Sequence, residues 1–345
     1  RDGIITPQDE DPLNAELPHT ADDAELEMMR SNSTWTTTEH NGFGTTVDSG
    51  GSFNCAIMAN GSVACWGDDG SAPDNYGPYI TSLPSGRTAV SLSVGGTHTC
   101  AVLDDGSAAC WGDNSYGQLA DGSIDTSWYT SVYADLPDDS SAVSVSTGSD
   151  FTCFLLENGT VACWGNNNQG QLGNGTTESA DGLPGFVAFP FSRSAISISS
   201  GASHTCAILD NASVACWGDN AESQLGDGTT TDRFSPVDAN LPSGRQALSV
   251  STGLYHTCAI LDNDSVACWG NNYHGQLGSG DYYSTTTQVT TPVYPSLPSE
   301  RFAVEISLGQ YHSCAILDNG SVVCWGWNYY GQLGTDVGYG EDPAS

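Results

Sequence analysis

The residues in this chain best suited to metal, redox or acid–base chemistry are its twelve cysteines and seven histidines. The cysteines form six pairs, and nine residues separate the members of each pair: Cys55 and Cys65, Cys100 and Cys110, Cys153 and Cys163, Cys206 and Cys216, Cys258 and Cys268, and Cys314 and Cys324. Four histidines stand two residues before the first cysteine of a pair, at His98, His204, His256 and His312. Thiolates and imidazoles could bind zinc, thiols could pair as disulfides, and a histidine could act as a general base.

The spacing of the cysteines favours disulfides over zinc ligands or reduced thiols. Structural zinc sites gather four ligands, usually with two to four residues between the members of a pair. In this chain successive pairs lie about 50 residues apart, so each pair would be alone in its own structural unit. Disulfides imply an oxidising compartment, and we therefore expect a secreted protein, extracellular or at a cell surface.

The cysteine pairs lie on predicted β-hairpins. Their turns have the form Leu-Asp-Asn-Gly, and a three-residue loop with a left-handed glycine is a common hairpin connection. This register places Cys206 directly opposite Cys216 and predicts a cross-strand disulfide in every hairpin. Ala212 and Asp264 replace the glycine in two copies, where they should adopt a positive φ. A further strand precedes five of the hairpins, at residues 89–94, 142–147, 195–200, 247–252 and 303–308.

The repeated histidines are predicted to pack rather than to catalyse. Phe53 and Phe151 occupy the same position in the other two units, and a position that accepts either residue is not that of a general base. The serines show no nucleophile elbow, so we predict no catalytic residue and no enzymatic activity. The loop at residues 227–232 lacks the alternating carboxylates of an EF-hand. It is expected to hold at most a weak calcium site, and no other metal or cofactor is predicted.

The cysteine pairs belong to an internal repeat of six units. Each pair is followed by a tryptophan, at Trp66, Trp111, Trp164, Trp217, Trp269 and Trp325, with spacings of 45, 53, 53, 52 and 56 residues. Repeats of this length with several short strands each predict an all-β propeller with one unit per blade. The count favours six blades, and seven remain an alternative.

The consensus of the units reads His-Thr-Cys-Ala-Ile-Leu-Asp-Asn-Gly-Ser-Val-Ala-Cys-Trp-Gly-x-Asn-x-x-Gly-Gln-Leu-Gly. It resembles the regulator of chromosome condensation repeat in its secreted, disulfide-bearing prokaryotic form, over residues 43–335. The resemblance implies a propeller, usually of seven blades, that acts as a protein-binding platform. The first unit departs from the pattern, with Asp-Asp-Gly-Ser-Ala-Pro at residues 68–73 in place of the Gly-Gln-Leu-Gly signature.

The charge of the chain excludes several classes of partner. Its 41 acidic residues outnumber its 7 basic ones, all of them arginine, and the formal net charge is −34. A surface of this sign cannot neutralise phosphates, so nucleic acid, chromatin and anionic lipid are not expected as partners. The exchange-factor activity of the nuclear family member is therefore not expected either. No run of 18 apolar residues is present, and no membrane insertion is predicted.

The two ends of the chain differ from the repeats. Residues 1–40 are predicted to form an acidic N-terminal arm, with a short helix near residues 20–30, before a propeller at residues 41–345. The last unit ends 12 residues after Leu333, and no outer strand is expected there. The strand-like residues 33–38 are therefore predicted to complete the last blade, in their own chain or in a neighbouring subunit.

Departures from the repeat symmetry mark the candidate binding residues. Loop aromatics are expected either to anchor an interface or to cover blade edges, at Trp35, Trp128, Tyr129, Tyr273, Tyr282, Tyr283, Trp327, Tyr329 and Tyr330. Glycosylation sequons occur at Asn32, Asn60, Asn158, Asn174, Asn211, Asn263 and Asn319. The asparagine of each Trp-Gly-x-Asn motif and the glutamine before each leucine recur in almost every unit. They are expected to hold turns and to bridge blades, respectively.

These features predict a non-enzymatic extracellular propeller that is a structural subunit of a filament or surface assembly. Neighbouring subunits would be linked through the N-terminal arm. The alternative is a secreted or surface-attached module that binds a protein or a glycan, and an enzyme is the third class.

Mass spectrometry of the unreduced protein tests the disulfides. Because all twelve cysteines should be paired, we expect a mass lower by 12 hydrogens than that of the all-thiol chain. Each disulfide closes a small loop and should stabilise the fold by about 2–3 kcal/mol by restricting the unfolded chain. Free thiols at these positions in the exported protein would contradict both the hairpin register and the oxidising compartment.

Overall fold

The computed structural model describes residues 46–70, 77–137, 140–280 and 288–334. The chain divides into two compact units, Arg1–Gly42 and Phe43–Ser345, and every described residue belongs to the second. The predicted arm at residues 1–40, with its helix and its strand at residues 33–38, therefore lies outside the described residues.

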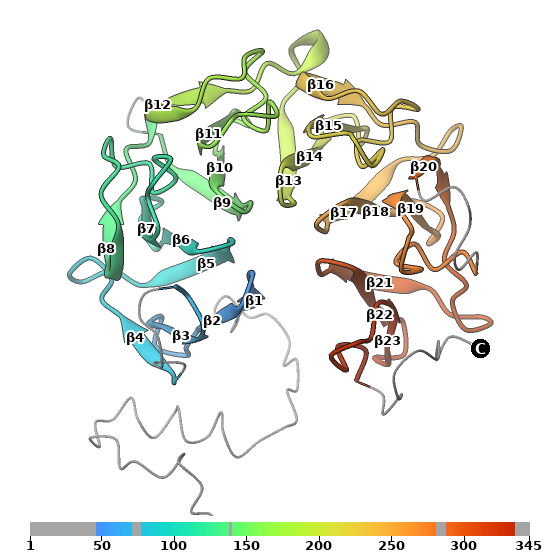
Figure 1. Cartoon of the computed structure of the whole chain (residues 1–345), viewed down its shortest axis with the longest axis horizontal. Coiled ribbons are helices and arrows are strands. Elements are labelled where there is room, and N and C mark those ends of the chain that lie inside the picture. Colours follow the sequence, from blue (N-terminus) through green and yellow to red (C-terminus); the bar gives the residue numbers. More distant parts are fainter. Residues whose placement is uncertain (1–45, 71–76, 138–139, 281–287, 335–345) are drawn as a thin grey trace, which may run out of the picture. The chain divides into compact units, whose positions relative to one another are not determined.

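The described residues form six antiparallel sheets arranged as the blades of a propeller (Figure 1), which confirms the predicted all-β class and the count of six. The first three blades comprise β1 (Val47–Ser49), β2 (Phe53–Ile57), β3 (Val63–Gly67) and β4 (Tyr79–Thr81); β5 (Ala89–Val94), β6 (His98–Leu103), β7 (Ala108–Gly112) and β8 (Ser127–Tyr133); and β9 (Ala142–Thr147), β10 (Phe151–Leu156), β11 (Val161–Gly165) and β12 (Ala180–Phe186). The last three comprise β13 (Ala195–Ser200), β14 (His204–Leu209), β15 (Val214–Gly218) and β16 (Arg233–Asp238); β17 (Ala247–Thr252), β18 (His256–Leu261), β19 (Val266–Asn271) and β20 (Gln288–Val293); and β21 (Ala303–Leu308), β22 (His312–Leu317) and β23 (Val322–Gly326). A short 3-10 turn, η2 (Pro190–Ser192), precedes β13.

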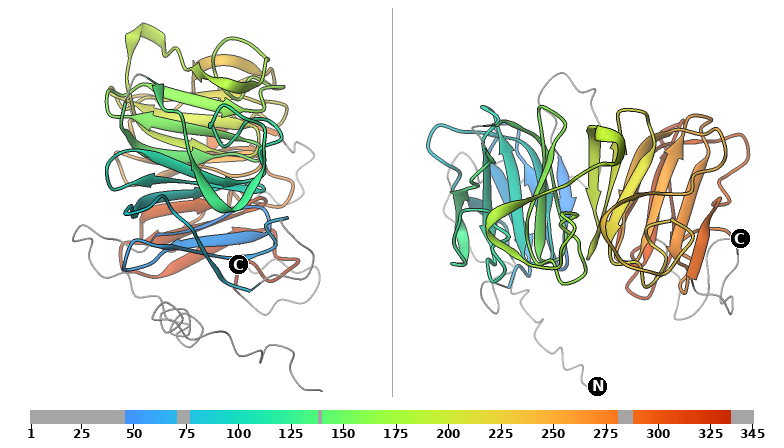
Figure 2. Two further views of the ribbon diagram at one scale, coloured as in Figure 1. Left: turned by 90° about the vertical axis from the view of Figure 1, so that its left-hand side faces the viewer. Right: turned by 90° about the horizontal axis from the view of Figure 1, so that it is seen from above.

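Each blade begins with a strand near the ring axis and proceeds outward strand by strand (Figure 1). Seen from the side, the strands span the thickness of the ring and the connections lie at its two ends (Figure 2). We call one end the hairpin end, because it carries the turns between second and third strands, such as residues 104–106. The opposite loop end carries the turns between first and second strands and the loops that follow the third strands.

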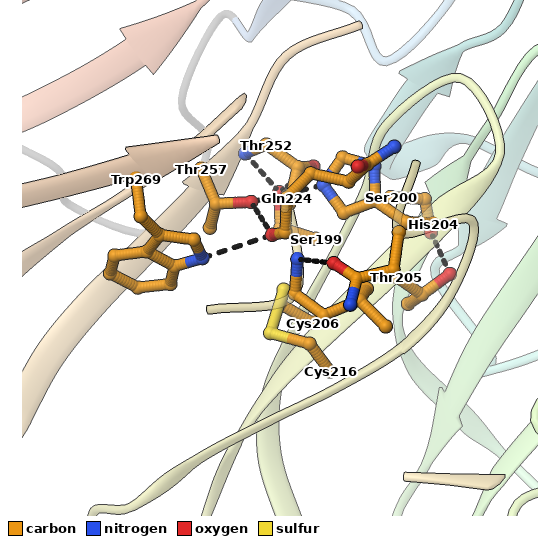
Figure 3. Close-up of a disulfide and its surroundings, with 12 residues drawn as sticks. Ser199, Ser200, His204, Thr205, Cys206, Cys216, Gln224, Thr252, Thr257 and Trp269 are labelled. Carbon is orange, nitrogen blue, oxygen red and sulfur yellow. Dashed lines mark hydrogen bonds between the residues drawn. A yellow bond between two sulfur atoms is a disulfide. The ribbon is translucent and has the colours of Figure 1, made fainter. Parts of the chain in front are cut away.

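The predicted hairpin register is confirmed. Cys206 of β14 faces Cys216 of β15, and the two are bonded (Figure 3). The same pairing forms the predicted disulfide in each of the other five blades. Ala212 and Asp264, which replace the turn glycine, have φ values of 62° and 65°.

Each blade packs against the next through one face of its sheet, which we call the forward face. Cys206, Val214 and Cys216 on the forward face of blade 4 share a core cluster with Leu261 and Trp269 of blade 5, and all five are buried. The disulfides therefore lie inside the cores between blades and not on the outer surface.

Buried polar groups cross the same junction between blades (Figure 3). The main-chain oxygen of Gln224 in blade 4 accepts hydrogen bonds from the Thr257 hydroxyl at 2.8 Å and the Trp269 indole at 2.9 Å, both in blade 5. Because that hydroxyl donates to Gln224, it accepts from Nε2 of His204 at 3.0 Å, which places the imidazole proton on Nε2. The same chain of bonds recurs between blades 2 and 3 and between blades 5 and 6. The predicted bridging by the glutamine is thus made by its main chain.

The histidines in these junctions have the packing role predicted from the phenylalanines. His98, His204 and His256 are fully buried, and burial lowers their pKa values to about 4, about 3 and about 3. Within the described structure, Nδ1 of His204 and of His256 has no hydrogen-bond partner. A proton there would add an uncompensated charge to a buried junction, so the imidazoles are neutral at physiological pH.

Within the described residues, no further blade packs on the forward face of blade 6. Its sheet has three strands within the described residues, whereas each of the other sheets has four. The inner strands of successive blades touch one another, beginning with the pair β1 and β5 and ending with the pair β17 and β21. No comparable contact joins β21 to β1 in the described part of the chain. Val322 on the forward face of blade 6 is 63% exposed, while Val266 at the same position of blade 5 is 2% exposed.

Mild acid should weaken the propeller through the buried histidines. An unfolded histidine binds a proton below about pH 6.5, whereas the folded ones do so only near pH 3 to 4. Between these values the unfolded state binds more protons, so the free energy of unfolding should fall as the pH drops. At pH 5.5 the loss should be about 1 kcal/mol for each buried histidine, measured by urea denaturation at pH 7.5 and 5.5.

His204→Phe is the matched variant for this measurement, because Phe151 fills the same position in blade 3. The variant should show a smaller fall in stability between the two pH values, by about 1 kcal/mol. A fall equal to that of the wild type would mean that these histidines are not its source.

Candidate binding surface on blades 5 and 6

In blades 2 to 6, the loop after the third strand is held by its own asparagine and glutamine. In blade 5, Oδ1 of Asn272 accepts a hydrogen bond from the main-chain N–H of Leu277 at 3.0 Å. Oε1 of Gln276 accepts one from the N–H of His274 at 2.9 Å. Equivalent bonds hold the loop at residues 327–333 of blade 6. The predicted role of the asparagine in its turn is confirmed, and the remaining side chains of each loop project from a hydrogen-bonded base.

A main-chain hydrogen bond joins each of these loops to the turn between the first two strands of the same blade. The N–H of Asn271 donates to the carbonyl of Tyr255 in blade 5, and the N–H of Trp327 donates to that of Tyr311 in blade 6, both at 2.9 Å. Within each of these two blades, the loop and the turn therefore lie side by side at the loop end of the propeller.

Seven rings form a continuous cluster at this place, which we call the aromatic surface: Tyr255, Tyr273, His274, Tyr311, Trp327, Tyr329 and Tyr330. Trp327 is its centre, with ring centroids 5.4 Å from His274 and 5.5 Å from Tyr311. Its indole stacks on Tyr329 at 5.9 Å with an interplanar angle of 14°. The cluster thus spans the boundary between blades 5 and 6.

The outer members of the cluster are open to solvent. Tyr273, Tyr329 and Tyr330 are 51%, 56% and 79% exposed, whereas Trp327 and His274 are half-buried beneath them. Exposed tyrosines around a partly buried tryptophan match the composition of interface cores, where large rings bury much area and lose little conformational entropy.

The electrostatic environment of the aromatic surface is negative. Glu222 of blade 4 accepts a hydrogen bond from Nδ2 of Asn271 at 2.7 Å. Burial raises the pKa of Tyr255, and the nearby groups Tyr311, Asp219 and Glu222 raise it further. Burial lowers the pKa of His274, so its imidazole is neutral at physiological pH. These residues therefore contribute negative charge and no positive charge.

The arginines of the described residues are all ion-paired elsewhere. Four pair with aspartates of the hairpin turns, in the pairs Arg87–Asp104, Arg193–Asp210, Arg245–Asp262 and Arg301–Asp318. The fifth, Arg233, pairs with Asp227 at 2.6 Å within blade 4. The hairpin end therefore holds most of the positive charge, and the paired aspartates neutralise that charge locally.

The structure divides the predicted interface residues into three groups. It brings together Tyr273, Trp327, Tyr329 and Tyr330 in the aromatic surface. Trp128 and Tyr129 lie on β8 of blade 2, where the Tyr129 ring meets that of Tyr79 in blade 1 edge to face at 5.5 Å. These two cover the junction between outer strands, which is the second of the two roles expected for loop aromatics. The others lie outside the described residues: Trp35, Tyr282 and Tyr283.

Tyr255, His274 and Tyr311 are members of the cluster that the sequence patterns did not single out. The residue before the repeated histidine is small or acidic in the other units, but tyrosine in units five and six. A second signal lies at Trp327. Its counterpart Asp219 accepts a hydrogen bond from Nε2 of Gln224, which an indole cannot do, so blade 6 has an aromatic ring in place of a structural acceptor.

The other candidate sites are engaged in local structure. In the loop at residues 227–232, the carboxylate of Asp227 is held by Arg233, Asn220 and Thr229. No cluster of three or more metal-ligating side chains occurs within the described residues. A cavity of about 130 Å³ at the ring axis is lined by small residues of the inner turns, such as Gly148, and by no titratable side chain. Among the described elements, none is a helix with the length and hydropathy needed to cross a membrane.

Five of the predicted glycosylation sequons lie in exposed hairpin turns, where each asparagine side chain accepts a hydrogen bond from the main chain two residues on: Asn60, Asn158, Asn211, Asn263 and Asn319. Asn174 is half-buried and accepts a hydrogen bond from Asn167. Asn32 lies outside the described residues. The exposed sequons are therefore at the end opposite to the aromatic surface, and whether they carry glycans stays a prediction.

Fold and surface together define a six-bladed β-propeller with a disulfide in every blade. The family model of the RCC1-like domain matches residues 37–344, and the chain belongs to this family. The predicted resemblance to the regulator of chromosome condensation repeat is thereby confirmed. Among individual proteins, the chain is 29% identical over 191 residues to the Ultraviolet-B receptor UVR8 of Arabidopsis thaliana, covering 55% of this chain and 42% of UVR8. The chain spans less than half the length of the curated relatives it matches.

Solved structures share the fold. Yeast RCC1 (Prp20) bound to Kap60 matches with a TM-score of 0.72 and 22% identity, over 86% of this chain and 72% of Prp20. The CRINKLY WD40 ectodomain of the Arabidopsis thaliana receptor kinase ACR4 matches with a TM-score of 0.51 and 22% identity, over 81% of this chain and 78% of that chain.

Proposed function

We propose that this protein is a non-enzymatic binding platform that engages a protein partner through the aromatic surface of blades 5 and 6. The observation that carries the proposal is the exposed tyrosine and tryptophan cluster centred on Trp327. Elsewhere in the described residues, aromatic contacts join only two rings at a time. A contiguous exposed cluster of aromatic rings is characteristic of interaction sites.

Similarity to known proteins supports a binding role. UVR8 is a receptor, and Prp20 has been solved in complex with Kap60. The polar groups repeated in the blades of this chain are used to join blades, which leaves the asymmetric loops as the part of the molecule free to recognise a partner.

We also propose that the protein works outside the cell or at its surface. Six disulfides, one in every blade, suit an oxidising compartment. The ACR4 ectodomain supplies a precedent for the same fold in an extracellular setting.

Site-specific cross-linking tests the binding surface. Replacing Tyr330 by the photo-cross-linker p-benzoylphenylalanine should give one covalent adduct of defined mass with a protein of the native extracellular material, identified by mass spectrometry. Tyr133 on β8 is the matched control, because it is a 51% exposed tyrosine far along the ring. Adducts that form equally from both positions, or from neither, would contradict a partner site on blades 5 and 6.

A structural role in a filament or surface layer is the second candidate function, and the open end of the ring favours it. The outer edge of β23 has no strand paired to it within the described residues, and the forward face of blade 6 exposes Val322. In this proposal residues 1–40 are a separate arm, and residues 33–38 add a strand to blade 6 of a neighbouring subunit. Such a contact joins different surfaces of the two subunits and grows a fibre when it does not close.

Deletion of residues 1–38 separates the two candidates. The truncated chain should retain six folded, disulfide-bonded blades, shown by circular dichroism and non-reducing mass spectrometry, but should no longer polymerise under negative-stain microscopy. If it polymerises like the full chain, the arm does not link subunits. Cross-linking from Tyr330 should persist in the truncated chain, since the aromatic surface lies wholly within the propeller.

A further inference from the structure

The charges next to the aromatic surface are of one sign. Glu222 and Asp219 lie close enough to raise the pKa of Tyr255, and Glu222 also touches Asn271 at the base of the blade 5 loop. The one basic side chain in the cluster, His274, is kept neutral by burial. Each arginine of the described residues is paired with an aspartate outside the cluster. The surface therefore combines aromatic rings with carboxylates and has no cation of its own.

This combination selects for a cationic ligand. A guanidinium or ammonium group gains electrostatically from the face of a tyrosine or tryptophan ring and from nearby carboxylates at the same time. Tyr329 is the exposed ring of its stack with Trp327, and Tyr330 stands beside Tyr329 edge to face at 4.9 Å. Arginine suits such a place better than lysine, because its planar group stacks on rings and forms paired hydrogen bonds with carboxylates.

We infer that the aromatic surface binds an arginine- or lysine-bearing segment of a partner protein, with basic side chains stacked on the exposed rings of Tyr329 and Tyr330 and attracted by the half-buried carboxylate of Glu222. This inference rests on the proposed function and specifies the chemistry of its partner. The net charge of −34 would also steer a basic segment toward the propeller and accelerate its association at low ionic strength.

Other occupants fit the charge less well. A second copy of this chain brings the same charge of −34, and residues 1–30 are strongly acidic, so neither supplies cations in number. A neutral glycan could stack on the rings and donate hydroxyl hydrogen bonds to the carboxylates, but it carries no positive charge to complement theirs. The observations therefore favour a basic protein segment.

Fluorescence anisotropy with defined peptides tests the inference on the full chain. The probe is a labelled peptide, (Gly-Ser-Arg)4, and its matched analogue carries citrulline in place of arginine, which keeps the shape but removes the charge. The arginine peptide should bind about tenfold more tightly than the citrulline peptide, and should weaken by about tenfold between 50 and 300 mM NaCl. Tyr330→Ala should weaken it by about threefold and Trp327→Ala by about fivefold.

Two carboxylate variants separate a specific site from general attraction to an acidic protein. Glu222→Gln should weaken binding by about threefold, whereas Glu157→Gln, which removes an exposed charge from the hairpin end of blade 3, should change it less than twofold. Equal effects of the two variants, or no effect of Tyr330→Ala, would overturn the inference. Tyr330 is 79% exposed, so its variant should fold normally.

Failure of the inference and of the proposed function can be told apart. If the Tyr330 cross-linker captures a partner but the arginine peptide neither binds nor competes, the surface is a protein site without basic specificity. If chitohexaose binds in a manner dependent on Trp327 and the peptide does not, the site is a glycan site and the inference is wrong. If the cross-linker captures nothing and the peptide does not bind, both fail.

Discussion

The junctions that follow blades 2 to 5 depend on one buried acceptor, the main-chain oxygen of the glutamine before the repeated leucine. In blade 4, this oxygen of Gln224 accepts hydrogen bonds from both the Thr257 hydroxyl and the Trp269 indole of the next blade. A buried carbonyl left without donors would cost about 1–3 kcal/mol, so a displaced blade would be strongly penalised. Because the hydroxyl donates its proton to the carbonyl, it can only accept from the histidine, which therefore carries its proton on Nε2. Glutamine, threonine, tryptophan and histidine therefore recur together because they serve one junction.

The disulfides act on the same junction from within the blade. They lie on the forward face, and Cys100 Sγ approaches Thr152 Oγ1 of the next blade at 3.6 Å. Bonding the second and third strands together holds the apolar forward face in the register that the next blade needs. On blade 6, where no following blade occurs in the described part of the chain, Val322 of this face is exposed while its counterparts in the other blades are buried.

The features that could be predicted from the sequence are those set by short-range periodicity. The hairpin register, the disulfides and the positive φ of Ala212 follow from turn length and glycine position alone. Contacts across blades are different, because they join residues that are far apart in the sequence. Tyr311 joins the cluster through ring contacts with His274 of blade 5 and Trp327 of its own blade, and Tyr129 covers a blade edge through its contact with Tyr79 of blade 1.

The aromatic surface lies where the fold constrains the main chain but leaves the choice of side chain open. The residue before the repeated histidine is required only to offer its carbonyl to the loop after the third strand, and it does so in all six blades. Serine, threonine, aspartate and tyrosine all satisfy that requirement. Tyrosine at positions 255 and 311 therefore leaves this hydrogen bond intact. Trp327 is different, since it occupies the place of an acceptor that other blades use to hold their glutamine. A residue that gives up a structural hydrogen bond to add an aromatic ring beside exposed tyrosines is best explained by the need to bind something.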